Sequence, residues 1–378
     1  MKEHEQPPAA LRGPPSVRLQ PGQWRDTPIH LLYKHCMPEC VVRLCEGESL
    51  DAFLAVAEKV YVGDSFHQPS RREAVLSGLR RKDFEACQAL FLAGDAARVA
   101  ARISSSLLDD AGRPCGLLGF FEAVNNTRAV RALFEAALDW LRAQGVKTVI
   151  GPMDGDTWHR YRLNVGPFDT APFLMEPYNP AYYPTLWESS GFSQIEGYYS
   201  SCVEDVPAAV RETERIAARA LARGYELRPL RIHAVRDDLL KIYEISRRIF
   251  AKNRFYTEIT SDEFLALYRG IDTLLVDGLN WFARDGSGED VGFVFAFPNR
   301  IGAAPPDAIN IKTLGVVPER QRTGVALALM HRVYSEIAKA GYRRANLCLI
   351  RDGNPSGRMD GGQGRVFRRY ALYQRILA

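Results

Sequence analysis

The chain has 378 residues, of which 46% are hydrophobic and 25% are charged. This composition is typical of a folded globular protein and excludes a disordered chain, and the length predicts two domains. The formal net charge of +4 suits an anionic ligand but is too small to indicate a nucleic-acid-binding surface. No apolar run is long enough for a membrane-spanning helix, and the start of the chain lacks the apolar segment of a secretory signal.

The seven cysteines form an odd and scattered set. This favours a reducing compartment, so we expect a cytoplasmic protein. Four candidate metal ligands lie close together near the start of the chain: His35, Cys36, Cys40 and Cys45. They contain no Cys-x-x-Cys pair and fit no common zinc-binding spacing. We therefore expect thiols without a metal site.

The first part of the chain predicts a tail followed by alternating strands and helices. Residues 1–38 contain Pro7-Pro8, Pro14-Pro15 and Pro21-Gly22, which predicts a poorly structured or extended tail. Four further elements are expected from hydrophobic periodicity: a strand at 41–44, a helix at 50–62, and paired strands at 89–93 and 98–104 around Gly94-Asp95.

A weak internal repeat relates the two halves of the chain. Leu118-Gly119-Phe120 matches Leu314-Gly315-Val316 at an offset of 196, and Gly145 matches Gly341 at the same offset. Between these anchors both halves show apolar residues at helical spacing, within 129–141 and 325–337, and then an apolar strand, at 146–150 and 345–350. Each helix ends at a glycine that suits a left-handed cap. We interpret this pattern as a duplicated strand–loop–helix–strand unit.

Between the two units, residues 205–224 are rich in Ala, Arg and Glu and predict a solvated connecting helix. The expected domains are therefore 39–204 and 225–378. Within the second, the pattern predicts strands at 230–235, 280–284 and 291–297, and helices near 238–251 and 261–268.

The segment Gln321-Arg322-Thr323-Gly324-Val325-Ala326 follows an apolar strand at 309–317 and leads into a helix. A bound pyrophosphate needs convergent backbone N–H groups, a positive helix end and room for close approach. Gly324 provides that room, and Arg320 and Arg322 add positive charge. The alternative is an ordinary strand-to-helix turn with no ligand.

This segment resembles the Gln/Arg-x-x-Gly-x-Gly/Ala motif of the GNAT (GCN5-related N-acetyltransferase) superfamily. The late Tyr…Gly-Phe pattern at 182–192 is similar to these folds, and residues 151–162 resemble a bacterial tandem-GNAT subgroup. The resemblance implies an α/β (α+β) protein of two tandem GNAT-like domains, each with a mixed, mostly antiparallel sheet flanked by helices. It implies acetyl-CoA or another acyl-CoA as co-substrate, with no metal. The implied contacts to CoA are Leu314, Gly315, Val316, Val317, the six residues of the loop, and Asn354.

The same offset of 196 tests the first half for a second CoA site. It places Arg128 where the second half has Gly324, and Glu122 adds negative charge nearby. Both features disfavour a pyrophosphate. We therefore expect one donor site, in the second half, and a first domain that is degenerate for CoA.

Acyl transfer to an amine needs proton removal, oxyanion stabilisation and a proton for the leaving thiolate. The resemblance implies a tyrosine acid, for which Tyr370 and Tyr373 are candidates, although the glycine-rich stretch at 360–364 interrupts the usual helix there. Glu258, Asp262 and Glu263 are candidate bases. The alternatives are buried aromatics for the tyrosines, a helix cap for the acids, and a water chain in place of any base.

A dense polar and aromatic set in the first half is the candidate acceptor site: Trp158, His159, Arg160, Arg162, Glu176, Asn179, Tyr182 and Tyr183. Arginines can bind a carboxylate through two hydrogen bonds, and aromatic rings can enclose a compact ligand. The alternative is that these residues form a packing surface between the domains.

The sequence thus predicts an N-acyltransferase, with acetyl as the first expected group. It would move the acyl group from acyl-CoA to the primary amine of a small, carboxylate-bearing metabolite by direct attack. Two rival interpretations are an aminoacyl-tRNA-dependent tandem-GNAT transferase and a non-catalytic acyl-CoA-binding regulatory module. The presence of the loop at 321–326 and the modest net charge argue against an aminoacyl-tRNA donor without excluding it. The sequence leaves the oligomeric state open.

Overall fold

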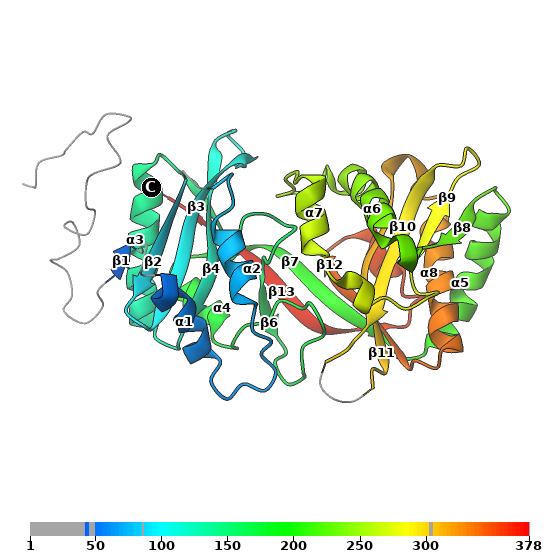
Figure 1. Ribbon diagram of the computed structural model, residues 1–378, viewed down its shortest axis with the longest axis horizontal. Helices are drawn as coiled ribbons and strands as arrows, with labels where there is room; N and C mark the ends of the chain where they lie inside the picture. Colours follow the sequence, from blue (N-terminus) through cyan, green and yellow to red (C-terminus); the bar gives the residue numbers. More distant parts are fainter. Residues whose placement is uncertain (1–41, 45–49, 85–86, 302–304, 378) are drawn as a thin grey trace, which may run out of the picture.

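One sheet runs through both halves of the molecule (Figure 1). The computed structural model describes residues 42–44, 50–84, 87–301 and 305–377. Within these ranges the sheet has thirteen strands. The predicted tail at 1–38 and the four candidate metal ligands at 35–45 lie outside the described residues. No helix in the described ranges is long and apolar enough to cross a membrane.

The first half follows the predicted order of strands and helices. Its elements are β1 (Val42–Leu44), α1 (Leu50–Val60), α2 (Arg72–Leu79), β2 (Gln88–Ala93), β3 (Ala97–Leu108), β4 (Pro114–Ala123), α3 (Thr127–Ala143), β5 (Thr148–Gly151), β6 (Leu163–Gly166) and α4 (Tyr183–Ser189). Strands β1 to β4 are antiparallel neighbours, and β4 pairs with β5 in parallel. The expected hairpin of β2 and β3 is present, with Gly94 at a φ of 56° in its turn.

The second half repeats this organisation. Its elements are β7 (Ser193–Val203), α5 (Val206–Leu221), β8 (Glu226–Pro229), α6 (Val235–Phe250), α7 (Ser261–Leu267), β9 (Trp281–Arg284), β10 (Asp290–Pro298), β11 (Ala308–Val316), α8 (Val325–Lys339), β12 (Arg344–Arg351) and β13 (Gly364–Ile376). The predicted strand at 230–235 is wrong: the chain there forms a 3₁₀ turn at Ile232–Ala234 that leads into α6. The buried carboxylate of Asp238 accepts the backbone N–H of Arg231 at 2.8 Å, and this contact turns the chain into the helix.

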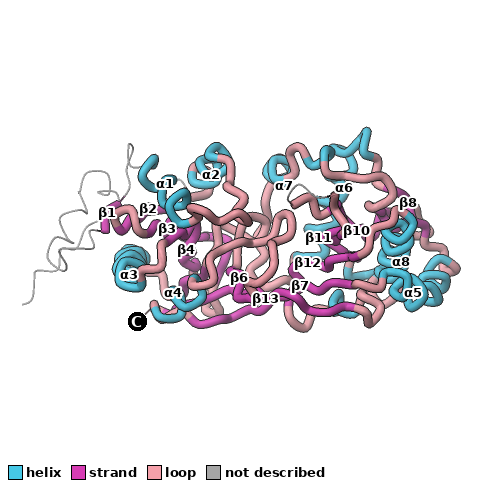
Figure 2. The backbone as a smooth tube through the Cα atoms, turned by 90° about the horizontal axis from the view of Figure 1, so that it is seen from below, coloured by secondary structure: helices cyan, strands magenta, loops and turns pink. Residues whose placement is uncertain are grey.

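Two long strands join the halves. The last strand, β13, lies between β5 and β7, so that Tyr373 pairs with Gly151 of the first half. Strand β7 pairs with β13 on one side and with β12 on the other. Figures 1 and 2 show both strands passing from one half into the other. The domain boundaries at 204 and 225 stay a prediction, because the end of the chain forms part of the first half's sheet.

Helices cover both faces of the sheet, as alternation along the strands requires. In the first half, Phe91 and Val99 face the core under α3, while Leu90 and Ala100 face α1. In the second half, Val294 and Ala296 face α8, while Phe293 and Phe295 face α6 and α7. Figure 2 shows α1, α2, α6 and α7 on one side of the sheet. Each half therefore has two hydrophobic layers, as in other mixed folds.

Helix α5 is not the solvated connection that the sequence predicts. One of its faces is buried against α8, with Ala217 and Ala220 in contact with Ala328. Small side chains at helical spacing permit this close approach of two helices. The packing places the end of α5 directly behind the loop that precedes α8.

Candidate donor and acceptor site

The loop before α8 presents free backbone groups at a helix N-terminus. Gly324 occupies the N-cap position with a φ of 91°, and no side chain of the described ranges caps the helix there. The first backbone bond of α8 joins the N–H of Ala328 to the carbonyl of Gly324 at 3.0 Å. The N–H groups at 325–327 therefore have no partner within the helix and add to its positive end. This is the geometry that binds phosphate groups.

Four contacts fix this loop. Gln321 donates from its side chain to the carbonyl of Val316 at 3.2 Å, and the Thr323 hydroxyl donates to the carbonyl of Arg320 at 2.7 Å. Arg223, just after α5, donates to the carbonyl of Thr323 at 3.0 Å. The guanidinium of Arg320 is paired with Asp285 at 2.9 Å, so it contributes less free charge than the sequence suggests.

The strand that leads to the loop separates from its parallel neighbour. Pairing of β11 with β12 covers only Ala308–Ile311 against Arg344–Leu347. A bulge then follows at Lys312, while Leu314, Gly315 and Val316 stay paired with β10. Farther along, β12 continues beside β7, where Ile350 pairs with Tyr199. The two strands therefore open like a fork, and the free edge of β11 can pair with an extended ligand.

In the first half the corresponding fork is filled by the protein's own chain. Strands β4 and β5 pair only at Gly116–Val149 and Leu117–Ile150. Past that point Met153 donates its N–H to the carbonyl of Leu118 at 2.8 Å, and Asp154 accepts the N–H of Phe120 at 2.6 Å. A Cβ at Gly119 would overlap the carbonyl oxygen of Met153. The space that would admit a ligand in the second half is closed here.

The helix that follows this closed fork is also capped. Helix α3 begins after Asn126, whose side chain accepts the N–H of Ala129 at 3.0 Å. Both helices end at glycines with a φ of 80°, Gly145 and Gly341, at the predicted offset of 196. Their starts differ by 198, because α3 is two residues longer at its N-terminus. At the N-cap position the counterpart of Gly324 is therefore Asn126, whereas Arg128, at the offset of 196, lies in the first turn of the longer helix α3.

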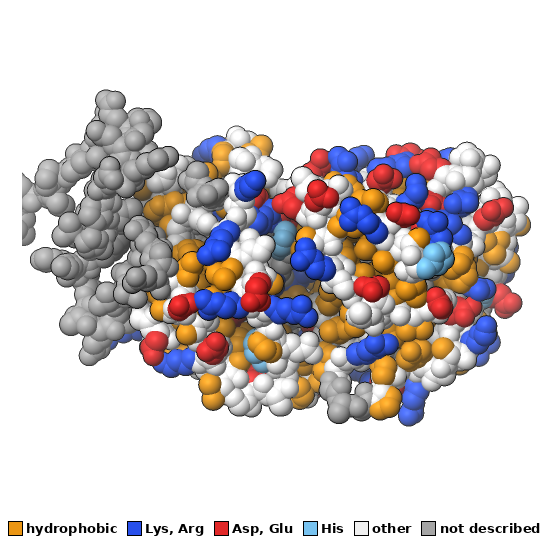
Figure 3. All heavy atoms as spheres, in the orientation of Figure 1, with side chains coloured by type: hydrophobic (Ala, Val, Ile, Leu, Met, Phe, Trp, Pro, Cys, Tyr) orange, Lys and Arg blue, Asp and Glu red, His pale blue; other side chains and the backbone are white. Residues whose placement is uncertain are grey.

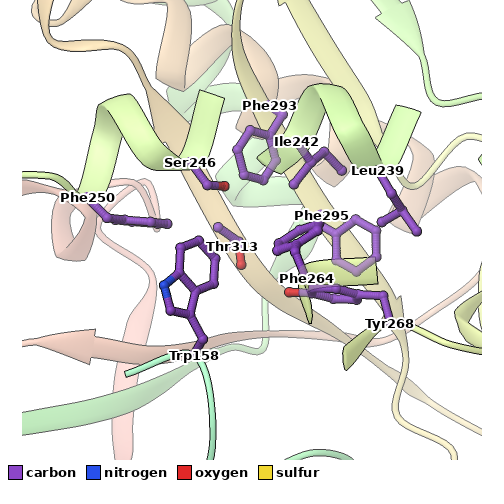
Figure 4. Close-up of a pocket in the computed structure, with 10 residues that line it drawn as sticks. All are labelled: Trp158, Leu239, Ile242, Ser246, Phe250, Phe264, Tyr268, Phe293, Phe295 and Thr313. Atoms are coloured by element: carbon purple, nitrogen blue, oxygen red, sulfur yellow. The ribbon is translucent and has the colours of Figure 1, made fainter. Parts of the chain in front are cut away.

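An apolar pocket lies in front of the open fork (Figure 4). Its cavity volume is about 30 Å³, roughly the space of one water molecule, so the pocket is much smaller than an ordinary small-molecule site. Its lining comes from α6, α7, β10 and β11 of the second half and from one loop of the first half: Leu239, Ile242, Ser246, Phe250, Phe264, Tyr268, Phe293, Phe295, Thr313 and Trp158. Thr313 lies one residue past the bulge of β11, so the pocket adjoins the fork.

Trp158 is the only member of the predicted acceptor set, among the described residues, that lines this pocket. Its indole N–H donates to the carbonyl of Thr257 at 2.9 Å, and its ring packs edge-on against Phe264. It thus connects the two halves and closes one side of the pocket. Both predicted roles, acceptor recognition and packing between domains, are compatible with this position.

Other members of the set are held by carboxylates within the first half. His159 contacts Asp156 at 2.8 Å, and Arg160 pairs with Glu122 at 3.0 Å. The Tyr183 hydroxyl also donates to Glu122, at 2.7 Å. Three more members have other partners: Tyr182 donates to the carbonyl of Ala123, Asn179 bonds to Asn164 and Pro180, and Glu176 contacts Arg368 and Tyr370. The structure therefore brings four members of the predicted set to one hollow of the first half, apart from the apolar pocket that Trp158 lines: Arg160, Arg162, Asn179 and Tyr183.

Buried charges in the first half have shifted pKa values with clear causes. Burial would raise the pKa of Asp156, but hydrogen bonds and charges from His159 and Arg81 outweigh it and lower the pKa to about 2. Burial likewise opposes the charge of Glu122, and nearby Arg160 and Arg98 hold its pKa below the usual value. These carboxylates are ionised anchors of the loop around 152–162. No cluster of three or more His, Cys, Asp or Glu suited to a metal occurs in the described part of the chain.

The candidate acid residues lie on β13, inside the protein. Tyr373 donates to Glu188 at 3.2 Å. Tyr370 donates to Glu176 and lies 3.1 Å from the hydroxyl of Ser200. Burial and Glu176 raise the pKa of Tyr370 well above its usual value, so the phenol keeps its proton at neutral pH. Ser200 in turn accepts the N–H of Leu349 at 3.1 Å, which connects Tyr370 with β12 at the fork.

The candidate bases have other partners. Glu263 forms a capping box with Thr260 at the start of α7, as the capping alternative predicts. Glu258 is largely exposed and pairs with Arg247 at 3.0 Å. Asn354, the candidate pantetheine contact, caps a 3₁₀ turn by accepting the N–H of Ser356 at 2.9 Å. None of these contacts tests a catalytic role.

Comparison with solved structures identifies this architecture. A conserved protein of unknown function from Enterococcus faecalis V583, described as a probable N-acyltransferase, aligns with a TM-score of 0.55 at 11% identity, over 89% of this chain and 72% of that one. A GCN5-related N-acetyltransferase from Anabaena variabilis aligns with a TM-score of 0.51 at 12% identity, with the same coverage. The chain has the GNAT fold. In this chain the fold has two related halves, and the parallel strands that separate are β11 and β12.

Sequence comparison is less specific. A bacterial ceramide synthase of Caulobacter vibrioides is 27% identical over 215 residues, which cover 56% of each chain. Protein YghO of Escherichia coli K12 is 21% identical over 202 residues, or 53% of this chain and 52% of that one. The chain thus spans about half the length of the curated relatives it matches. No protein-family model matches the chain.

Sequence reasoning missed most of the apolar pocket and the contacts that support the loop before α8. For the pocket residues Ser246, Phe250 and Phe264 the sequence predicts only that they belong to helices. Arg223 was assigned to a solvated helix, although it contacts Thr323. The apolar spacing along 239–250 was the one available signal for the pocket. It indicates a buried helix face but not whether that face borders a cavity.

Proposed function

We propose that this chain is an N-acyltransferase that takes its acyl group from acyl-CoA bound at the second half. One contrast carries the proposal: the second half has an uncapped helix start at Gly324 beside an open fork, and the first half has a capped helix start at Asn126 beside a filled one. The free N–H groups at 325–327 suit the pyrophosphate. The free edge of β11 suits the amide groups of the pantetheine arm.

The proposed reaction is direct attack in a ternary complex. A neutral amine nitrogen attacks the thioester carbonyl, the C–N bond forms, and the C–S bond then breaks to release CoA. The backbone N–H of Val316 is the candidate for stabilising the oxyanion. The N–H of Gly315 is directed to β10, because Val317 donates to the carbonyl of Val291 and hydrogen-bonded pairs alternate along antiparallel strands. We propose Tyr370 as the acid for the leaving thiolate, since it is protonated and connected to the fork through Ser200. We assign proton removal from the amine to water, because Glu258 and Glu263 are engaged elsewhere.

A second candidate concerns the size of the transferred group. The pocket beside Thr313 is lined mainly by apolar and aromatic side chains, which favour a hydrocarbon chain over a polar metabolite. The relative from Caulobacter is named a ceramide synthase, and a ceramide is an amide of a fatty acid with a long-chain amino alcohol. On this candidate the chain would transfer a longer acyl group from CoA, and the pocket would widen from its volume of about 30 Å³ to take the acyl tail.

The decisive experiment measures binding and turnover separately. Calorimetric titration of the purified protein with CoA and acetyl-CoA should show one site per chain. Release of CoA thiol should then appear with at least one member of a panel of amines. Binding without turnover across the panel would favour the regulatory module. Failure to bind CoA, together with activity that ribonuclease abolishes, would favour the aminoacyl-tRNA donor and contradict the proposal.

A further inference from the structure

Arg162 is a buried arginine at the junction of the two halves. It follows the filled fork of the first half, has a φ of 69°, and is 8% exposed. Its guanidinium carbon lies 3.9 Å from the ring centre of Tyr161 and 4.2 Å from that of Tyr198. The two rings are nearly perpendicular, so the guanidinium lies in the corner that they form. Cation–π contact with both rings holds it there and leaves N–H groups for hydrogen bonds.

These N–H groups have few partners among the described residues. Among the described residues, the one hydrogen bond from this guanidinium is a long one, from Nη1 to the carbonyl of Leu349 at 3.5 Å. Its Nε is buried without any partner, and no carboxylate of the described chain forms an ion pair with it. A buried charge without a partner is costly, and stacking on two rings offsets only part of the cost.

The neighbouring Arg160 shows the contrast. Both arginines line the same hollow of the first half, together with Phe121, Tyr161, Tyr178 and Asn179. Arg160 is neutralised by Glu122 at 3.0 Å and lies 3.8 Å from Asp154. The nearby carboxylate of Glu196 is directed to Arg254 and Arg351. The hollow therefore carries one positive charge that the described residues leave unpaired.

The position of Arg162 relates this hollow to the donor fork. Leu349, whose carbonyl it contacts, lies two residues beyond Leu347, the last residue of β12 that pairs with β11. The unpaired guanidinium is thus at the mouth of the fork in which the acyl group is proposed to bind. Figure 3 shows further Lys and Arg side chains at the surface on both sides of the junction.

We propose that Arg162 binds a carboxylate or phosphate group of the acceptor, so that the acceptor's amine faces the fork. This inference rests on the proposed acyl transfer and names the class of its acceptor: an amine that also carries an acid group. Arginine can hold either anion through two parallel hydrogen bonds. The pair would neutralise the charge that the folded protein leaves buried.

The first test needs no turnover. Thermal unfolding of the protein is followed with increasing glycine, phosphoethanolamine and ethanolamine. A ligand that binds the folded state raises the melting temperature. We expect a rise with glycine or phosphoethanolamine but not with ethanolamine, and the two acidic probes separate carboxylate from phosphate. Arg162→Gln should abolish the rise, and Arg365→Gln, at an exposed ion pair with Glu204, should preserve it. An equal rise in Arg162→Gln would overturn the proposal.

The second test uses turnover. With acetyl-CoA, the wild type should favour acidic amines over their uncharged amides or dephosphorylated forms by at least tenfold in kcat/KM. Arg162→Gln should remove this preference and leave acetyl-CoA affinity within twofold, and Arg162→Lys should restore part of it. A variant that only melts earlier and keeps the preference would show a structural role. If no amine is acylated but the anion-dependent stabilisation is lost in Arg162→Gln, the anion site stands and the acyl transfer fails.

Discussion

Gly324 at the start of α8 lies directly against Ile216 of α5. A Cβ added to Gly324 would lie 3.1 Å from Cγ2 of Ile216, closer than side-chain carbons normally approach. The loop is therefore confined between α5 behind it and the proposed pyrophosphate in front. Since the φ of Gly324 is 91°, any other residue at this position would have a strained backbone and a side chain pressed against Ile216.

We expect Gly324→Asp to weaken acyl-CoA binding by at least tenfold, about 1.4 kcal/mol. The new side chain meets Ile216 at a backbone conformation that suits glycine, so the loop must shift, and the carboxylate adds negative charge beside the proposed pyrophosphate. Calorimetric titration measures this directly. Gly341→Ala is the matched control, because Gly341 has a similar φ of 80° and open space around it. It should cost about 1 kcal/mol of stability and leave donor affinity unchanged. Equal donor affinity in Gly324→Asp and wild type would refute the site.

The first half should not contribute to donor binding. Asn126→Ala removes the cap of α3 and should lower the free energy of unfolding by about 1 kcal/mol. Because the adjacent fork is filled by residues 152–154, the dissociation constant for acetyl-CoA should change by less than about twofold. Denaturant unfolding and calorimetry measure the two quantities. A large loss of affinity at unchanged stability would place donor contacts in the first half.

The two buried tyrosines of β13 form a matched pair for the acid role. Tyr370→Phe should lower kcat by at least tenfold at unchanged acetyl-CoA affinity, because its hydroxyl connects with the fork through Ser200. Tyr373→Phe removes only a bond to Glu188. It should cost about 1 kcal/mol of stability and keep kcat within twofold. Steady-state kinetics with any amine that is acylated decides between them, and equal kcat values in both variants would argue against Tyr370.

The low pKa of Asp156 predicts that part of the free energy of unfolding is lost in acid. Its pKa of about 2 in the folded protein is below the ordinary 3.8. Its contribution is therefore complete above about pH 4 and lost as the pH falls toward 2. The loss should be about 2 kcal/mol at 1.36 kcal/mol per pKa unit. Unfolding free energies of wild type and Asp156→Asn, compared at pH 5 and pH 2.5, should converge at the lower pH; parallel curves would contradict the assignment.

The apolar pocket makes a prediction about acyl length. If a hydrocarbon tail occupies it, octanoyl-CoA should bind at least tenfold more tightly than acetyl-CoA, since each buried CH₂ contributes about 0.8 kcal/mol. Ser246→Leu narrows the pocket and should remove this preference while acetyl-CoA affinity stays within twofold. Calorimetry on both donors provides the measurement. A preference that survives in Ser246→Leu would place the tail elsewhere.

Local patterns were sufficient for most helices and strands and for the strand–loop–helix around Gly324. Apolar spacing located α3 and α8, and Gly145 and Gly341 marked their ends, because helix periodicity and left-handed caps depend on neighbouring residues. The glycine at 324, following a strand and opening a helix, indicated the loop for the same reason. The prediction of a strand at 230–235 was wrong. The buried carboxylate of Asp238 accepts the backbone N–H of Arg231, and Asp238 lies beyond the residues whose alternation suggested the strand.

Only the tertiary structure decided how the two units join and which of them can admit a ligand. The insertion of β13 between β5 and β7 depends on pairing between residues more than 150 positions apart, which no local pattern encodes. The filling of the first fork by Met153 and Asp154 follows from that arrangement of chain segments. The difference between the two arginines also depends on the fold. The sequence gives no reason to prefer Arg160 or Arg162 as a ligand-binding residue. In the folded chain Glu122 neutralises Arg160, and no carboxylate of the described residues pairs with Arg162.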